Sequence, residues 1–285
     1  MKWNLRYASH LGYRDPLRGL YTASAGSDDP VAQIDFAAAL GFAGMQYARA
    51  VDGTKAERAV VRKALERHGL ETGCMVYAGR EIVLAPLWAD TGAASRATRE
   101  HALAASFEVA REINSRHVIV FSGADPRIPL ALQHAAFVEN LKRAAPLAEA
   151  NGIVLCLENM SRKSRTGTLL SHLGEAYAVA KAVDSPAVRI VFDTSHVQVM
   201  DGDVLDNLRA VWDAVAIVQI ADNPGRREPG SGELNFENIL RAVYELGYAG
   251  LVELEHDWST PTRESEERGL AYLQALDARL ANSAA

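Results

Sequence analysis

The chain has 285 residues, of which 48% are hydrophobic, and a formal net charge of -6 at pH 7. This length suits two domains or one large α/β barrel, and the apolar fraction supplies enough side chains for a sizeable core. The acidic balance argues against a nucleic-acid partner, because there is no excess of Lys and Arg to neutralise phosphates.

Membrane and secretory signals are missing from the sequence. No apolar run approaches the roughly 18 residues that a membrane helix needs, and the N-terminus lacks the basic-then-apolar pattern of a signal peptide. Cys74 and Cys156 are too few for a disulfide framework. We therefore expect a cytoplasmic protein with reduced thiols, a small-molecule partner and no membrane contact.

Short β-branched or aromatic runs alternate along the chain with longer segments that have helical spacing. Strands are predicted at residues 4–8, 44–47, 72–77, 117–121, 154–158, 189–193, 216–220 and 251–255. Helices are predicted at residues 31–40, 55–68, 95–113, 134–150, 170–183, part of 204–215, 236–246 and 262–280. Several helices are followed by a glycine, which favours a left-handed helix cap: Gly41, Gly69, Gly152 and Gly247.

Repeated strand-helix units without a break in composition predict one closed parallel barrel, the (β/α)8 TIM barrel of the α/β class. The barrel is expected to span residues 1–285 as a single domain. A doubly wound open sheet is the alternative. No Gly-x-Gly-x-x-Gly turn follows the first strand, so a dinucleotide-binding fold has little support.

Four consecutive predicted strands end in side chains that offer oxygen atoms: Glu158, Asp193, Gln219 and Glu255. Such barrels place their functional residues where strands run out into the following loops. Three bare carboxylates at one mouth would repel one another, whereas a hard divalent cation would neutralise them and accept all four oxygens. Each residue alone could instead form a salt bridge or cap a helix. The repetition in successive units favours a metal site.

The segment "VQIADNPGRREPGSGELNF" resembles the hallmark of the hydroxypyruvate isomerase family, within the xylose-isomerase-like sugar isomerases and epimerases. "FDTSHVQVMDGDV" and "LVELEH" resemble two further segments of that family. The resemblance implies that Glu158, Asp193, Gln219 and Glu255 coordinate one divalent metal ion, such as Mn²⁺, Mg²⁺, Co²⁺ or Zn²⁺. It further implies that Glu158 and Glu255 are the catalytic acid/base pair, that His196 and Arg226 contact substrate oxygens, and that the chain forms a homodimer or larger homo-oligomer.

The loop after Glu158 departs from that family. Ser161, Lys163 and Ser164 stand where the family has Asn, Arg and Asp. Since this loop is expected to overlie the site, the substrate stays open between a free sugar and a sugar acid. The segment 79–95 also differs, and its apolar residues Leu84, Leu87 and Trp88 suggest a lid over the mouth. The alternatives are a plain packing role for Trp88 or an oligomer contact.

Other residues have weaker assignments. His10, at the end of the first strand, is a candidate substrate contact or a structural histidine. Glu233 is expected to brace the Gly-rich loop by accepting backbone N–H groups. Glu253 shares a face with Glu255 by strand alternation, so it is expected to point into the barrel and pair with a basic group. Cys156 suits an inner packing layer.

The leading hypothesis is a metal-dependent isomerase or epimerase that acts through an enediolate on a small hydroxy-carbonyl compound. Its main alternative is a lyase or dehydratase, because the same intermediate can expel a β-leaving group. An abasic-site endonuclease would need clustered histidines and a basic groove. A non-catalytic barrel would be expected to have lost part of the ligand set, and all four positions are present.

Overall fold

A computed structural model describes residues 2–281 of the chain. Its strands are β1 (Arg6–His10), β2 (Gly44–Gln46), β3 (Glu71–Thr72), β4 (Met75–Val76), β5 (His117–Val120), β6 (Val154–Leu157), β7 (Val188–Asp193), β8 (Val215–Ile220) and β9 (Leu251–Leu254). Its helices are α1 (Thr22–Ala25), α2 (Pro30–Ala39), α3 (Lys55–His68), α4 (Ala93–Ile113), α5 (Leu130–Ala150), α6 (Leu173–Val183), α7 (Thr194–Met200), α8 (Val204–Val211), α9 (Phe236–Glu245) and α10 (Arg263–Leu280).

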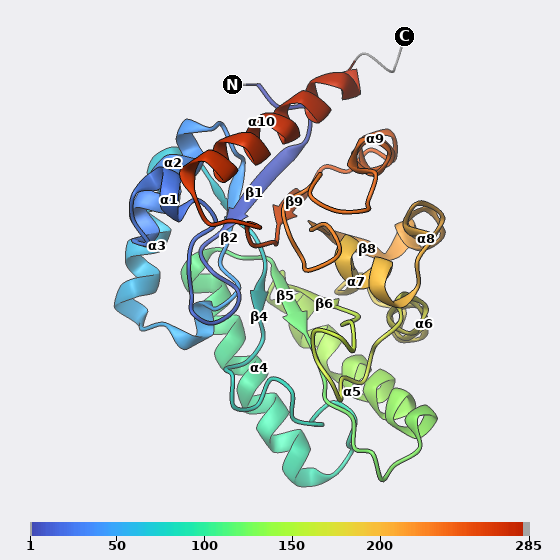
Figure 1. The fold of residues 1–285 in the computed structure, drawn as a ribbon. Helices are drawn as coiled ribbons and strands as arrows, with labels where there is room; N and C mark the ends of the chain where they lie inside the picture. The colour runs from blue at the N-terminus through green and yellow to red at the C-terminus, as the bar shows by residue number, and fades with distance from the viewer. Residues whose placement is uncertain (1, 282–285) are drawn as a thin grey trace.

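The strands form one parallel sheet in the order β3-β2-β1-β9-β8-β7-β6-β5-β4, with the helices packed around it (Figure 1). The strand predicted at 72–77 is interrupted by Gly73 and Cys74, which leaves β3 and β4 at the two ends of this order. The Val76 amide donates to the Ala48 carbonyl beyond β2, while the Tyr77 amide donates to the Ile119 carbonyl on β5. This interrupted strand therefore joins both ends of the sheet, and the predicted α/β TIM barrel is confirmed.

The hydrophobic core has two parts. The large part fills the space between the strands and the surrounding helices. A small cluster inside the barrel contains Cys74, Ile119, Cys156, Val191 and Ile217, all of which are buried. Cys156 thus lies in an inner packing layer, as predicted, and this apolar layer is the floor beneath the polar residues at the mouth.

Local signals set several helix boundaries. Helix α3 begins with a capping box between Thr54 and Glu57 and ends at Gly69, which has a φ of 65°. Helix α10 lies beside β1 (Figure 1), and the Asp277 carboxylate accepts the Asn4 and Leu5 amides at 2.7 and 3.0 Å. These bonds fix the first strand against the last helix.

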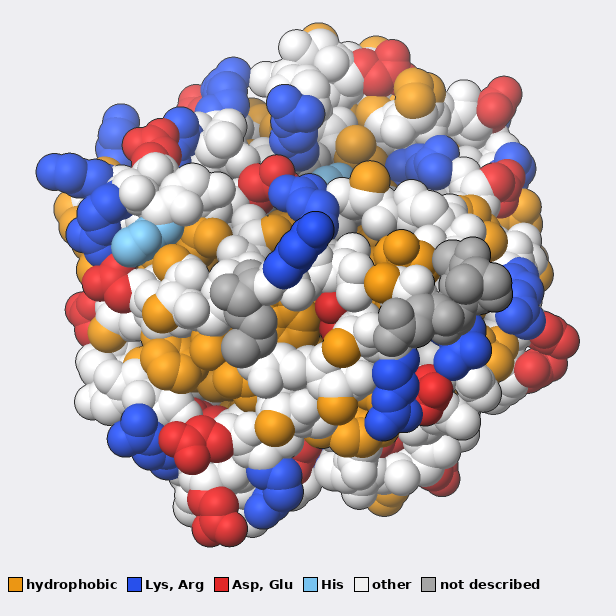
Figure 2. Space-filling model, turned by 90° about the horizontal axis from the view of Figure 1, so that it is seen from above, with side chains coloured by type: hydrophobic (Ala, Val, Ile, Leu, Met, Phe, Trp, Pro, Cys, Tyr) orange, Lys and Arg blue, Asp and Glu red, His pale blue; other side chains and the backbone are white. Residues whose placement is uncertain are grey.

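On the face shown in Figure 2, cationic and anionic side chains are interspersed. Within residues 2–281, no helix is long and apolar enough to cross a membrane.

Candidate metal centre and active site

The four predicted metal ligands all lie buried at the carboxyl ends of their strands. Asp193 and Gln219 are register partners on β7 and β8, while Glu158 and Glu255 directly follow β6 and β9. Their exposed fractions are 4% for Glu158, 0% for Asp193, 0% for Gln219 and 8% for Glu255. Buried acidic groups need a counter-charge or hydrogen-bond donors, so their partners decide what the site can do.

His196 joins two of the carboxylates. Asp193 caps helix α7 by accepting the His196 backbone amide at 2.9 Å, which turns the imidazole inward. The His196 Nε2 atom lies 3.4 Å from Glu158 Oε1, and its Nδ1 atom lies 3.3 Å from the Ser161 amide nitrogen. One potential ligand atom each from Glu158, Asp193 and His196 lies within 4.8 Å of the others. This spacing would suit a shared cation.

Gln219 supplies the observation that tests the fit to a metal. Its Nε2 atom donates to Glu253 Oε2 at 3.0 Å, whereas its buried Oε1 atom has no hydrogen-bond partner among the described residues. A buried carbonyl oxygen without a donor is costly, and a hard divalent cation is a suitable acceptor of its lone pairs. The Gln219 oxygen therefore fits a divalent metal ion, and two other predicted ligands, Glu158 and Asp193, lie in the group that also contains His196 but not Glu255.

The loop that carries Arg226 is held by Asp222. The Asp222 carboxylate accepts backbone N–H groups across the loop, from Asn223, Gly230, Gly232 and Leu234. The prediction that Glu233 does this was wrong, because its carboxylate accepts from Gln198 Nε2 instead.

Arg226 is buried and bridges two predicted ligands. Its Nη1 and Nη2 atoms donate to Asp193 Oδ1 and Oδ2 at 3.0 and 2.7 Å, and Nη2 also donates to Glu255 Oε1 at 2.7 Å. The guanidinium carbon lies 5.6 Å from the centroid of the Tyr13 ring. Tyr13 was not singled out from the sequence, since nothing in "LGYRD" indicates contact with a residue more than 200 positions later.

Burial and neighbouring charges shift the pKa values of Asp193 and Glu255. Burial raises the pKa of Asp193, but Arg226 and His196 outweigh that effect and leave it below its usual range. Burial also raises the pKa of Glu255, to about 8, with Arg226 opposing and the neighbouring carboxylates Glu158 and Asp193 reinforcing the rise. Burial and the neighbouring carboxylates thus favour the protonated form of Glu255, whereas Arg226 favours the ionised form.

Glu253 points into the barrel, as predicted, but its predicted basic partner is wrong. Its carboxylate accepts from Cys74, Gln46 and Gln219. The Gln46 Nε2 atom also makes a short hydrogen bond to Glu255 Oε2. Sequence reasoning missed Gln46, although its place near the end of the predicted strand 44–47 is the signal that identified the other site residues.

A cavity of about 210 Å³ opens over these residues. Glu158, His196, Arg226 and Glu255 line it, and the loop after β6 borders it through Met160, Ser164 and Arg165, as predicted. Leu84 lines the cavity, whereas Trp88 is fully buried and packs on Tyr77 and Phe137 with ring centroids 5.8 and 5.7 Å apart. Of the alternatives for segment 79–95, packing therefore holds for Trp88.

Comparison with protein families identifies the fold family. The model of the xylose isomerase-like TIM barrel matches residues 34–276. The chain belongs to this family.

Curated relatives of this xylose isomerase-like protein include proteins named as isomerases. It is 30% identical over 172 residues to hydroxypyruvate isomerase from Escherichia coli strain K12, and 29% identical over 170 residues to 2-oxo-tetronate isomerase from Cupriavidus necator. These matches cover 60% and 59% of this chain, and 65% and 64% of the relatives. The match thus spans less than two thirds of each relative's length.

Solved structures share the fold. An AP endonuclease, family 2, from Brucella melitensis superposes with a TM-score of 0.78 at 23% identity, covering 95% of this chain and 98% of that one. A D-psicose 3-epimerase crystallised in the presence of D-fructose superposes with a TM-score of 0.71 at 20% identity, covering 86% and 93%. At these identities the structures establish the barrel alone.

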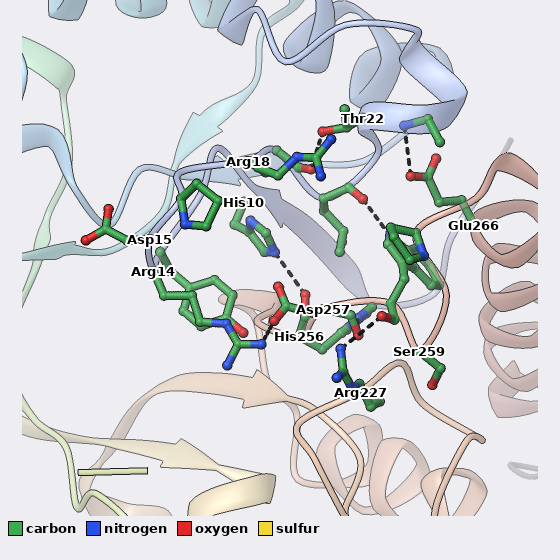
Figure 3. A pocket seen from close by; sticks show the side chains of 17 residues that line it. His10, Arg14, Asp15, Arg18, Thr22, Arg227, His256, Asp257, Ser259 and Glu266 are labelled. Carbon is green, nitrogen blue, oxygen red and sulfur yellow. Dashed lines mark hydrogen bonds and ion pairs between the residues drawn. The ribbon is translucent and has the colours of Figure 1, made fainter.

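The xylose isomerase-like barrel has a second, larger cavity of about 710 Å³ (Figure 3). Tyr13 and Arg14 line both this cavity and the smaller one. His10 lies in its wall, where Nε2 is 3.0 Å from the His256 carbonyl oxygen and Nδ1 accepts the Gly12 amide at 3.1 Å. Burial lowers the pKa of His10 to about 4, so its imidazole is neutral at pH 7. Both ring nitrogens are thus engaged by the backbone.

Proposed function

We propose that this protein is a divalent-metal-dependent isomerase or epimerase that acts on a small hydroxy-carbonyl compound. One observation carries the proposal: Glu158 and Glu255, from the ends of β6 and β9, line the same small cavity together with His196 and Arg226. The named relatives, which are isomerases, support the same class of reaction. The cavity volume of about 210 Å³ suits a substrate smaller than a typical drug.

The proposed metal ligands are Glu158, Asp193, Gln219 and Glu255. Oxygen donors of this kind suit Mg²⁺ or Mn²⁺, and Co²⁺ or Zn²⁺ can take mixed oxygen and nitrogen sets. A bound cation would act as a Lewis acid and stabilise negative charge that develops on the substrate oxygens. The unpartnered Gln219 oxygen supports this role.

Proton transfer is assigned to two carboxylates. Glu158 or Glu255 removes the proton from the carbon beside the carbonyl, and the pair returns it after the enediolate forms. Return to the same carbon from the opposite face gives epimerisation, whereas return to the neighbouring carbon gives isomerisation. His196, which lies 3.4 Å from Glu158, is placed to donate to a substrate oxygen. Leu84, Phe121 and Met160 form an apolar wall that limits water.

The cavity lining favours an acidic substrate. Four arginines line it: Arg14, Arg49, Arg165 and Arg226. Arg14, Arg49 and Arg226 pair with acidic residues of the chain. Arg165 forms no ion pair with any residue in the range 2–281, and it is exposed at the edge of the cavity. A guanidinium group binds a carboxylate in a bidentate manner, so we propose that Arg165 holds the carboxylate of a sugar acid.

NMR in deuterated water tests both parts of the proposal. A panel of hydroxy-carbonyl compounds, with neutral sugars and their sugar-acid counterparts as matched pairs, is incubated with Mn²⁺-loaded and chelator-treated protein, and Mn²⁺ is removed before spectra are taken. We expect deuterium at the exchanging carbon and a rearranged product, and both should appear only with metal. Sugar acids should react in preference to neutral sugars, and Arg165→Gln should remove this preference. Elimination products would point to the lyase alternative, and an inert panel would contradict the proposal.

A further inference from the structure

Glu253 is a fully buried acidic side chain that the proposed reaction does not use. It lies on β9 directly opposite Gln219 on β8, at the level where the polar mouth meets the apolar inner layer. Its exposed fraction is 2%. A Cβ atom at Gly73 would lie 2.4 Å from Glu253 Oε1, so a glycine at position 73 makes room for the carboxylate.

No Lys, Arg or His between residues 2 and 281 forms an ion pair with Glu253. Its Oε1 atom accepts the Cys74 amide at 2.7 Å. Its Oε2 atom accepts from Cys74 Sγ, Gln46 Nε2 and Gln219 Nε2 at 3.0, 3.1 and 3.0 Å. Burying a carboxylate without a cationic partner costs free energy of folding even when such donors are present. We therefore looked for a function of Glu253 in its contacts.

The role follows from the geometry of a side-chain amide. A carboxylate accepts hydrogen bonds, so Gln46 and Gln219 must each turn their NH₂ group toward Glu253. Both Oε1 atoms then face elsewhere, and both are buried without a hydrogen-bond partner among the described residues. One is the proposed metal-ligating oxygen of Gln219. The same Gln46 NH₂ group also reaches Glu255.

We propose that Glu253 is a positioning residue that fixes the amide orientation of Gln219, so that this side chain presents its oxygen rather than its nitrogen to a divalent cation. Through Gln46 it also holds Glu255. The inference rests on the proposed metal site and adds a residue outside the predicted ligand set. Groups that orient metal ligands in this way typically change metal affinity 10–100-fold when they are removed.

The test compares Mn²⁺ binding to the metal-stripped full-length chain and to Glu253→Gln. The variant keeps the shape of the side chain but adds a donor, so Gln219 can turn over. We expect a dissociation constant about 10–100-fold weaker by calorimetry and an altered visible absorption spectrum of the Co²⁺-loaded protein. Glu266→Gln is the matched control, because Glu266 is equally buried, accepts the backbone amides of Ala23 and Ser24, and lies outside the cluster. It should bind Mn²⁺ as the wild type does.

A double-mutant cycle separates positioning from general structural damage. In a Gln219→Ala background, Glu253→Gln should weaken Mn²⁺ binding far less than in the wild type. An equal loss in both backgrounds, or a wild-type dissociation constant and Co²⁺ spectrum for Glu253→Gln, would overturn the inference. If Glu253→Gln does not fold, Glu253→Asp replaces it, because aspartate keeps the charge but its shorter side chain moves the carboxylate away from Gln219. An unchanged Mn²⁺ affinity of Glu253→Asp would also overturn the inference. Failure of the wild type to bind any divalent metal would instead reject the proposed function.

Discussion

Replacing Arg226 with methionine should destabilise the metal-free protein strongly and the metal-loaded protein less. The substitution keeps an unbranched apolar stem but removes three charge-assisted hydrogen bonds, two to Asp193 and one to Glu255. Breaking a buried ion pair by removing one partner costs about 3–5 kcal/mol, since the other charge stays buried. A divalent cation among the same carboxylates would replace the lost positive charge.

Urea unfolding of both proteins, with and without saturating Mn²⁺, measures this difference. Arg226→Met should lower the unfolding free energy relative to the wild type, and we expect this loss to be about 1–2 kcal/mol smaller with Mn²⁺ than without it. This difference corresponds to the net contribution of one hydrogen bond. By thermodynamic linkage, Arg226→Met should then bind Mn²⁺ about tenfold more tightly. Arg227→Met is the control, because the Arg227 side chain donates only to the Trp258 carbonyl among the bonds of residues 2–281. Equal losses with and without Mn²⁺ would refute the idea that Arg226 neutralises the metal-ligating carboxylates.

Three other predictions concern the proposed proton-transfer pair, His10 and Gly232. Glu158→Gln and Glu255→Gln should each abolish deuterium exchange at the substrate's α-carbon with unchanged circular dichroism, and retained exchange in both would exclude their role in proton transfer. Because the folded-state pKa of His10 is about 4 against 6.5 for the free side chain, stability should fall as pH drops from 6.5 toward 4. The expected contribution of His10 is about 2–3 kcal/mol by pH 4.5, and His10→Asn should lose correspondingly less stability over that range in urea titrations. Gly232→Ala should lower the melting temperature, because its Cβ atom would lie 1.9 Å from the Asn223 carbonyl oxygen; an unchanged value would show that the loop can rearrange.

Local signals account for the parts of the fold that the sequence predicted well. Helix α3 has the predicted bounds because its capping box and the left-handed Gly69 are both encoded within the segment itself. Helix α7 was missed because "TSHVQVM" contains two valines and directly continues a strand, and its start depends on Asp193 as cap. The break in the strand at 72–77 depends on pairing with both ends of the sheet.

In the candidate site, too, some features were predictable from the sequence and others depend on contacts between distant segments. The rule that strand ends meet at one mouth was enough to select Glu158, Asp193, Gln219 and Glu255, because it needs only the order of the strands. Side-chain alternation gave the direction of Glu253 but not its partners. Gln219 lies on the neighbouring strand β8, but Gln46 on β2 and Cys74 between β3 and β4 belong to non-adjacent parts of the barrel, where strand tilt and register decide which residues face β9.

The most direct test of the account is the metal content of the purified protein. Protein prepared without added ions and analysed by mass spectrometry should contain about one divalent metal ion per chain, and Asp193→Ala should contain far less. Chelator treatment should abolish deuterium exchange into the substrate, and Mn²⁺ should restore it. A metal-free protein whose activity is indifferent to chelator would contradict the central claim.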